Sequence, residues 1–105
     1  MYQSPIPASL PAPLIEQLCT AAISCGASRL VLFGSRARGD HRDTSDIDLA
    51  VWGLSSTEAG RLRLLLDDLP TLLCFDLVPV TPDTNPALLK NIQNEGVVLY
   101  AADEV

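Results

Sequence analysis

The chain has 105 residues, with seven Lys and Arg against thirteen Asp and Glu and a formal net charge of -6. A chain of this length buries roughly 60–70% of its unfolded surface, which suffices for one core and excludes a second domain with a core of its own. No apolar run approaches the ~18 residues of a membrane-spanning helix, so we expect a cytoplasmic protein, and the negative charge argues against direct nucleic-acid binding.

Prolines dominate the start of the chain, where four of the eight lie within the first thirteen residues. Proline lacks a backbone N–H and fixes φ, so we expect a proline-rich lead-in over residues 1–10 and one domain over residues 11–105. A helix can begin near Pro11, because the first turn of a helix tolerates the missing N–H. Apolar residues then recur at helical spacing, and Gly26 is placed to end this helix in a left-handed conformation.

A short, continuous apolar run over residues 29–33 is typical of a buried strand. It is followed by a polar segment, residues 34–45, which contains three of the seven basic residues. These three are Arg36, Arg38 and Arg42. After this segment, residues 46–52 alternate with period two, which predicts a strand with Asp46 and Asp48 on one face.

The second half of the chain predicts two more helices and two more strands. A leucine stripe indicates a helix over residues 58–69, preceded by Ser and Thr as candidate N-caps. Residues 72–80 are apolar on both faces apart from Asp76, which favours a central strand. A last helix begins at Asn85 and ends at Gly96, before an edge strand over residues 97–100.

This order of elements predicts the fold class. It is typical of an α/β (α+β) domain in which helices pack on a mixed sheet of about four strands. The three cysteines, Cys19, Cys25 and Cys74, have neither disulfide-framework nor metal-ligand spacing, so we expect buried free thiols.

Two carboxylates on the same face of a strand need positive charge nearby. Positions i and i+2 lie roughly 7 Å apart, so Asp46 and Asp48 would repel one another without a cation. Oxygen-only ligands suit Mg²⁺, which completes its octahedron with water and substrate phosphates. If the strand carrying Asp76 pairs beside them, three acids cluster and a two-metal site becomes feasible. Alternatively, Asp76 caps a turn or pairs with an arginine.

The segment after the first strand suits a phosphate group. Gly34 ends a buried strand and the backbone then turns into a short helix, so Ser35 and the next amides face an anion at a helix N-terminus. Arg36 and Arg38 add positive charge nearby; the sequence favours Arg36 only marginally as the phosphate contact, and either could pair with surface acids instead. Together with the acids, these residues indicate a site for a triphosphate with Mg²⁺.

At these residues the sequence resembles the minimal nucleotidyltransferases of the DNA polymerase β superfamily. The resemblance rests on Gly34-Ser-Arg-Ala-Arg-Gly39 followed by Ser45-Asp-Ile-Asp-Leu-Ala-Val51. It implies transfer of AMP from ATP with release of diphosphate. By the same resemblance Gly34 and Ser35 hold the triphosphate, Asp46 and Asp48 bind Mg²⁺, and Asp76 completes the metal site and helps to deprotonate an acceptor hydroxyl.

Small members of this family are similar to the antitoxins of toxin–antitoxin pairs with a HEPN-domain RNase toxin. The resemblance therefore implies ATP and a HEPN-type toxin as partners, with a tyrosine of the toxin as the acceptor of AMP. It also allows the two proteins to form a hetero-oligomer. Two alternatives remain. One is a non-catalytic antitoxin that occludes its partner; the other is transfer to a small molecule such as an aminoglycoside, which the short chain disfavours.

Overall fold

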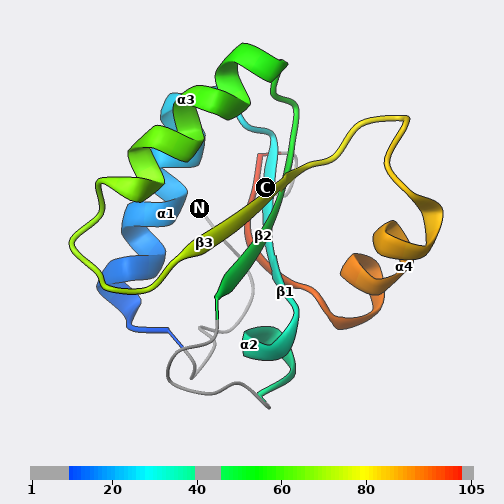
Figure 1. Cartoon of the computed structure of the whole chain (residues 1–105), viewed down its shortest axis with the longest axis horizontal. Helices are drawn as coiled ribbons and strands as arrows, with labels where there is room; N and C mark the ends of the chain where they lie inside the picture. Colours follow the sequence, from blue (N-terminus) through cyan, green and yellow to red (C-terminus); the bar gives the residue numbers. More distant parts are fainter. Residues whose placement is uncertain (1–9, 40–45, 103–105) are drawn as a thin grey trace.

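The computed structural model contains one mixed sheet of four strands, in the order β3-β2-β1-β4 (Figure 1). The structure describes residues 10–39 and 46–102. The strands are β1 (Arg29–Phe33), β2 (Ile47–Trp52), β3 (Phe75–Pro79) and β4 (Val97–Ala101). β1 pairs antiparallel with both β2 and β4, whereas β2 and β3 are parallel. The predicted α/β class with a mixed sheet of about four strands is confirmed.

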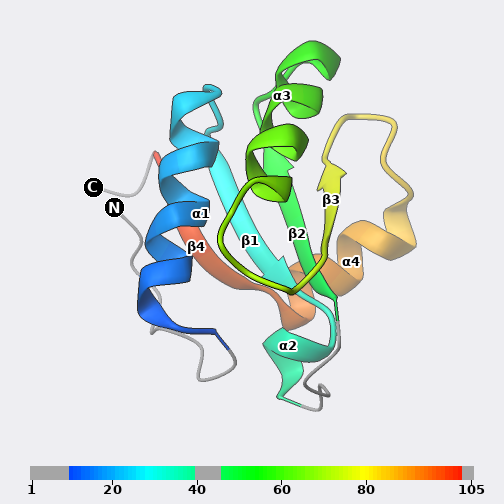
Figure 2. The same ribbon diagram turned by 60° about the vertical axis from the view of Figure 1, so that its left-hand side comes forward.

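Helices cover both faces of this sheet. They are α1 (Ala12–Ser24), α2 (Ser35–Arg38), α3 (Ser56–Asp67) and α4 (Pro86–Glu95). Figures 1 and 2 show α1 and α3 side by side on one face, α4 on the other, and the short α2 at the end of β1. In the described part of the chain, no helix has the length and apolar character needed to cross a bilayer.

Local sequence signals explain where the helices start and stop. The N–H of Glu58 donates to Ser55 Oγ (3.2 Å) and the N–H of Ser55 donates to Glu58 Oε1 (2.9 Å), so a capping box starts α3. Asn85 Oδ1 accepts a hydrogen bond from the N–H of Ala87 (2.8 Å) at the start of α4. Gly26 follows α1 with φ of 96°, as the sequence predicts.

The apolar core has two parts, one on each side of the sheet. The larger lies under α1 and α3, and the described chain begins with Leu10 buried in it. The smaller lies under α4 and consists of Val31, Phe33, Ala50 and Ile92. Because side chains alternate along β1, this strand contributes to both parts, which explains its continuous apolar run.

The predicted central position of the strand containing Asp76 is wrong. β3 is an edge strand and starts only at Phe75, so Leu72 lies outside it and is fully exposed. The apolar residues on both faces of β3 are explained by the helices that pack above and below the sheet, and not by a neighbouring strand on each side. Pro79 is consistent with the edge position, because proline cannot donate a ladder hydrogen bond.

The cysteine prediction is confirmed in two of three positions. All three thiols are free, and Cys19 and Cys25 are buried. Burial raises the pKa of Cys19, whose Sγ donates to the carbonyl oxygen of Leu99 (3.4 Å). Cys74 is exposed because it precedes β3 instead of lying within a central strand.

Candidate functional site

The site begins where β1 ends, at Gly34. Its φ of 77° and ψ of -158° are conformations that side-chain-bearing residues rarely adopt. A Cβ built at this position would collide with the carboxylate of Asp48. The close approach arises because Phe33 is paired with Asp48 in the β1–β2 ladder. Glycine is therefore required here both for backbone conformation and for space.

The four-residue helix α2 follows directly. The N–H groups of Ala37 and Arg38 both donate to the carbonyl oxygen of Gly34 (3.1 Å each), which closes the turn that the sequence predicts. Ser35 and Arg36 occupy the first turn of this helix. The two arginines differ in environment, since Arg36 is buried whereas the side chain of Arg38 is 46% exposed.

The acids meet because β2 and β3 are parallel and in register. Asp48 is paired with Asp76 across the two strands, where neighbouring backbones lie about 4.8 Å apart. The N–H of Ile47 donates to the carbonyl oxygen of Cys74 (2.9 Å), so the pairing holds up to the start of both strands. Asp46 directly precedes β2 and is exposed.

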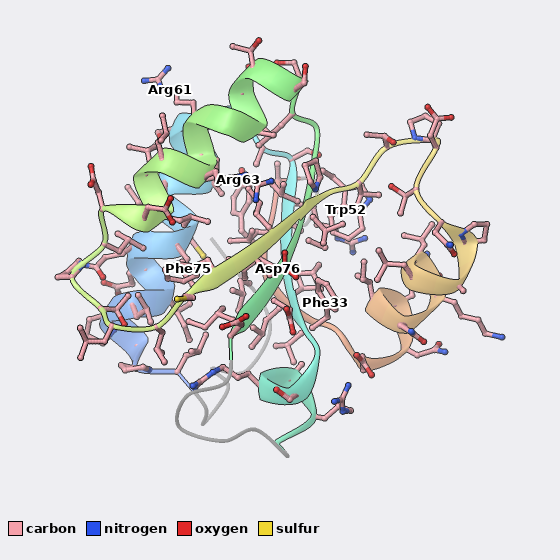
Figure 3. The ribbon with its side chains drawn as sticks, in the orientation of Figure 1. Phe33, Trp52, Arg61, Arg63, Phe75 and Asp76 are labelled. Carbon is pink, nitrogen blue, oxygen red and sulfur yellow. The ribbon has the colours of Figure 1, made fainter. Side chains whose placement is uncertain are left out.

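Alternation along the strands places the acids on the α4 side of the sheet. Figure 3 shows Asp76 on the same side as Phe33 and Trp52, whereas Phe75 and Arg63 lie on the α3 side. The site is therefore bordered by the β1–α2 turn, by the start of β2 and β3, and by the end of α4.

Electrostatics mark Asp48 as the centre of this site. Burial raises the pKa of Asp48, and the nearby carboxylates of Asp76 and Asp46 raise it further, as does Glu95 more weakly. The Arg38 guanidinium acts in the opposite direction without cancelling these effects. The carboxylate thus lies in a field of excess negative charge, which a cation would relieve.

The donor chemistry at Asp46, Asp48 and Asp76 fits Mg²⁺, because all three offer only carboxylate oxygens. Within residues 10–39 and 46–102, no three acidic, cysteine or histidine side chains lie close enough together to form a ready metal centre. Asp48 and Asp76 are direct neighbours, whereas Asp46 precedes β2 and is exposed. Residues 40–45, with Arg42, lie outside the described residues.

Sequence reasoning missed Glu95, the last residue of α4. Its Oε1 accepts a hydrogen bond from the N–H of Gly34 (3.2 Å), and both carboxylate oxygens lie 3.1 Å from Arg38 Nη1. A sequence signal was available. A carboxylate at the C-terminal end of a helix opposes the helix dipole, which marks Glu95 as an unusual place for an acid.

Comparison with known proteins identifies a family model and a shared fold. The model described as polymerase beta, nucleotidyltransferase matches residues 26–105, which contain every site residue named above. A search of curated protein sequences finds no match.

Solved structures have the same fold. A chain of a toxin–antitoxin complex with AMP-PNP has a TM-score of 0.65 at 22% identity, over 86% of this chain and 75% of that chain. A chain from tri-AMPylated Shewanella oneidensis HEPN toxin in complex with MNT antitoxin has a TM-score of 0.61 at 20% identity, over 83% and 69%. A proposed minimal nucleotidyltransferase reaches 30% identity with a TM-score of 0.62, over 80% of this chain and 87% of that chain.

Proposed function

Because this chain belongs to the polymerase β nucleotidyltransferase family, we propose that it is a Mg²⁺-dependent protein adenylyltransferase. It moves AMP from ATP to a hydroxyl group of a partner protein and releases diphosphate. The observation that carries the proposal is the pairing of Asp48 with Asp76 directly beside Gly34, which puts carboxylates for a cation next to a turn suited to phosphate.

The partner we propose is a HEPN-type toxin, with a tyrosine hydroxyl as the acceptor. Two of the similar structures support this assignment, since one is a toxin–antitoxin complex with AMP-PNP and the other contains a tri-AMPylated HEPN toxin. In this assignment the chain is an antitoxin, and it neutralises its partner by modifying it within a complex of the two proteins.

The residues of the site have separate tasks in the proposed reaction. Gly34, Ser35, Arg36 and Arg38 bind and orient the triphosphate of ATP. Asp46, Asp48 and Asp76 would hold Mg²⁺, which would lower the pKa of the acceptor hydroxyl and stabilise the leaving diphosphate.

Asp76 is exposed, so an acceptor can reach it, and we assign it to receive the hydroxyl proton. The acceptor oxygen then forms a bond to the α-phosphorus as the bond to diphosphate breaks, and orientation of the two groups supplies much of the rate.

The test is a double substitution, Asp46→Asn with Asp48→Asn. The chain is purified with its co-expressed partner, incubated with Mg²⁺ and labelled ATP, and both proteins are weighed by mass spectrometry. We expect AMP on the partner with the wild type and a loss of transfer of at least about a hundredfold with the variant. Asp83→Asn, at an exposed position outside the site, controls for a single replacement of Asp by Asn and should retain full activity.

Neutralisation of the partner in cells separates catalysis from occlusion. If the double variant still neutralises the toxin fully, catalysis is not the mechanism and the chain acts by binding. If the wild type adds no AMP to any co-purified protein, the proposed function is wrong.

A further inference from the structure

Glu95 makes the contacts that a phosphate group would be expected to make in this site. Its Oε1 lies 3.2 Å from the nitrogen of Gly34 and 3.1 Å from Nη1 of Arg38, while Oε2 lies 3.1 Å from the same Nη1. A backbone N–H at a helix start and a guanidinium are the donors that proteins commonly direct at phosphate oxygens.

The position of Glu95 is determined by the packing of the next residue, Gly96. A Cβ at Gly96 would collide with the side chain of Val31 and with the carbonyl oxygen of Ile92. The end of α4 therefore lies directly against β1, and the N–H of Gly96 donates to the carbonyl oxygen of Ile92 (2.8 Å). This close packing directs Glu95 toward the turn after β1.

Apart from its ion pair with Arg38, the surroundings of Glu95 disfavour a negative charge. The helix dipole disfavours a carboxylate at the C-terminal end of α4, and the carboxylate adds to the negative charge around Asp48. Its side chain is 26% exposed, so it has room to swing toward solvent. A neutral glutamine could still accept the hydrogen bond from Gly34.

We propose that the Glu95 carboxylate occupies a phosphate position of the nucleotide site and is displaced by the incoming triphosphate, so that it limits nucleotide affinity. The inference rests on the proposed function, in which Gly34 and Arg38 bind the triphosphate. Displacement of Glu95 releases both donors at once, because the same carboxylate contacts both. Nucleotide binding is thereby coupled to the end of α4.

Glu95→Gln tests the proposal, because it removes the charge and keeps the shape. Calorimetric titrations with ATP and Mg²⁺, and with inorganic tripolyphosphate as a probe of the phosphate position alone, give the Kd values. We expect the Kd for both ligands to fall by about three- to tenfold, the range that relief of one competing ion pair allows. Asp83→Asn makes the same change in net charge and should leave both Kd values unchanged.

A second measurement uses the wild type and does not depend on the folding of a variant. When tripolyphosphate is titrated into ¹³C-labelled protein, the side-chain carboxyl resonance of Glu95 should shift as the carboxylate leaves Gly34 and Arg38. Weaker or unchanged binding by the glutamine variant overturns the proposal, as does a Glu95 resonance that stays constant at saturation. If the wild type binds neither ATP nor tripolyphosphate, the proposed function fails as well.

Discussion

At the scale of single residues, Asp48 and Gly34 show a conflict between stability and chemistry. Asp48 is half-buried in a strand, paired with Asp76, and close enough to Gly34 to exclude any side chain there. A packed sheet does not need a carboxylate at this position, and a glycine with positive φ beside it adds nothing to the core. Such groupings of perturbed charge and unusual backbone are typical of functional sites.

We predict that Asp48→Asn stabilises the metal-free protein at neutral pH. The pKa of Asp48 is raised in the folded state, so its ionised form costs stability at every pH above both pKa values. As the pH falls through the folded-state pKa, Asp48 takes up a proton and this cost disappears. The variant should therefore exceed the wild type in free energy of unfolding most clearly near pH 7, and this difference should vanish below the unfolded-state pKa. Urea unfolding with a chelator present measures it. Equal stability of the two proteins at pH 7 would contradict the prediction.

A pair of glycine substitutions should have opposite effects. Gly34→Ala should lower the free energy of unfolding by about 1–3 kcal/mol, because alanine disfavours this backbone conformation and its Cβ meets Asp48. Gly60→Ala is the matched control, since Gly60 lies within α3 with open space around it, and it should add about 0.5–1 kcal/mol. Thermal and urea unfolding of both variants measure the difference, and a neutral Gly34→Ala would show that the turn is not under this constraint.

At the scale of elements, β3 is the critical part of the site, because it carries Asp76 and is held from one side only. Its backbone pairs with β2 alone. An additional contact comes from α3, where Nη2 of Arg63 donates to the carbonyl oxygen of Leu77 (3.2 Å). Figure 3 shows Arg63 directed toward the sheet and Arg61 directed away from it. The helix thus helps to anchor the edge strand.

We predict that Arg63→Gln loosens β3, with a loss of about 0.5–1.5 kcal/mol in the free energy of unfolding. Amide hydrogens of β3 should exchange faster in this variant, whereas those of β1 should be affected only through global stability. Arg61→Gln, on the same helix and exposed, should change stability by less than about 0.5 kcal/mol. Similar exchange rates of β3 in the two variants would show that the Arg63 contact does not hold the strand.

At the scale of the whole molecule, the site lies where four distant parts of the chain converge. The β1–α2 turn, the start of β2 and β3, and the end of α4 each contribute charged groups to it. A groove of ≈ 550 Å³ lies between α1 and α3, on the opposite face. The residues that line this groove include Glu16 and no Lys or Arg, so it lacks the groups that a triphosphate requires.

The amino-acid sequence by itself determined what depends on near neighbours in the chain. Helix ends at Ser55, Asn85 and Gly26, and the turn at Gly34, follow from capping, proline and glycine chemistry within a few residues. The fold class could be predicted for the same reason, since apolar spacing and loop lengths are local properties. The motif around Asp46 and Asp48 also lies in one short segment.

Tertiary structure alone decided how remote segments meet. The edge position of β3 could not be predicted, because apolar residues on both faces arise equally from neighbouring strands and from helices above and below the sheet. The pairing of Asp48 with Asp76 depends on the register of β2 and β3, which a sequence pattern does not specify. Glu95 reaches Gly34 across 61 positions of the chain only because Gly96 packs against β1, a contact made by the folded core.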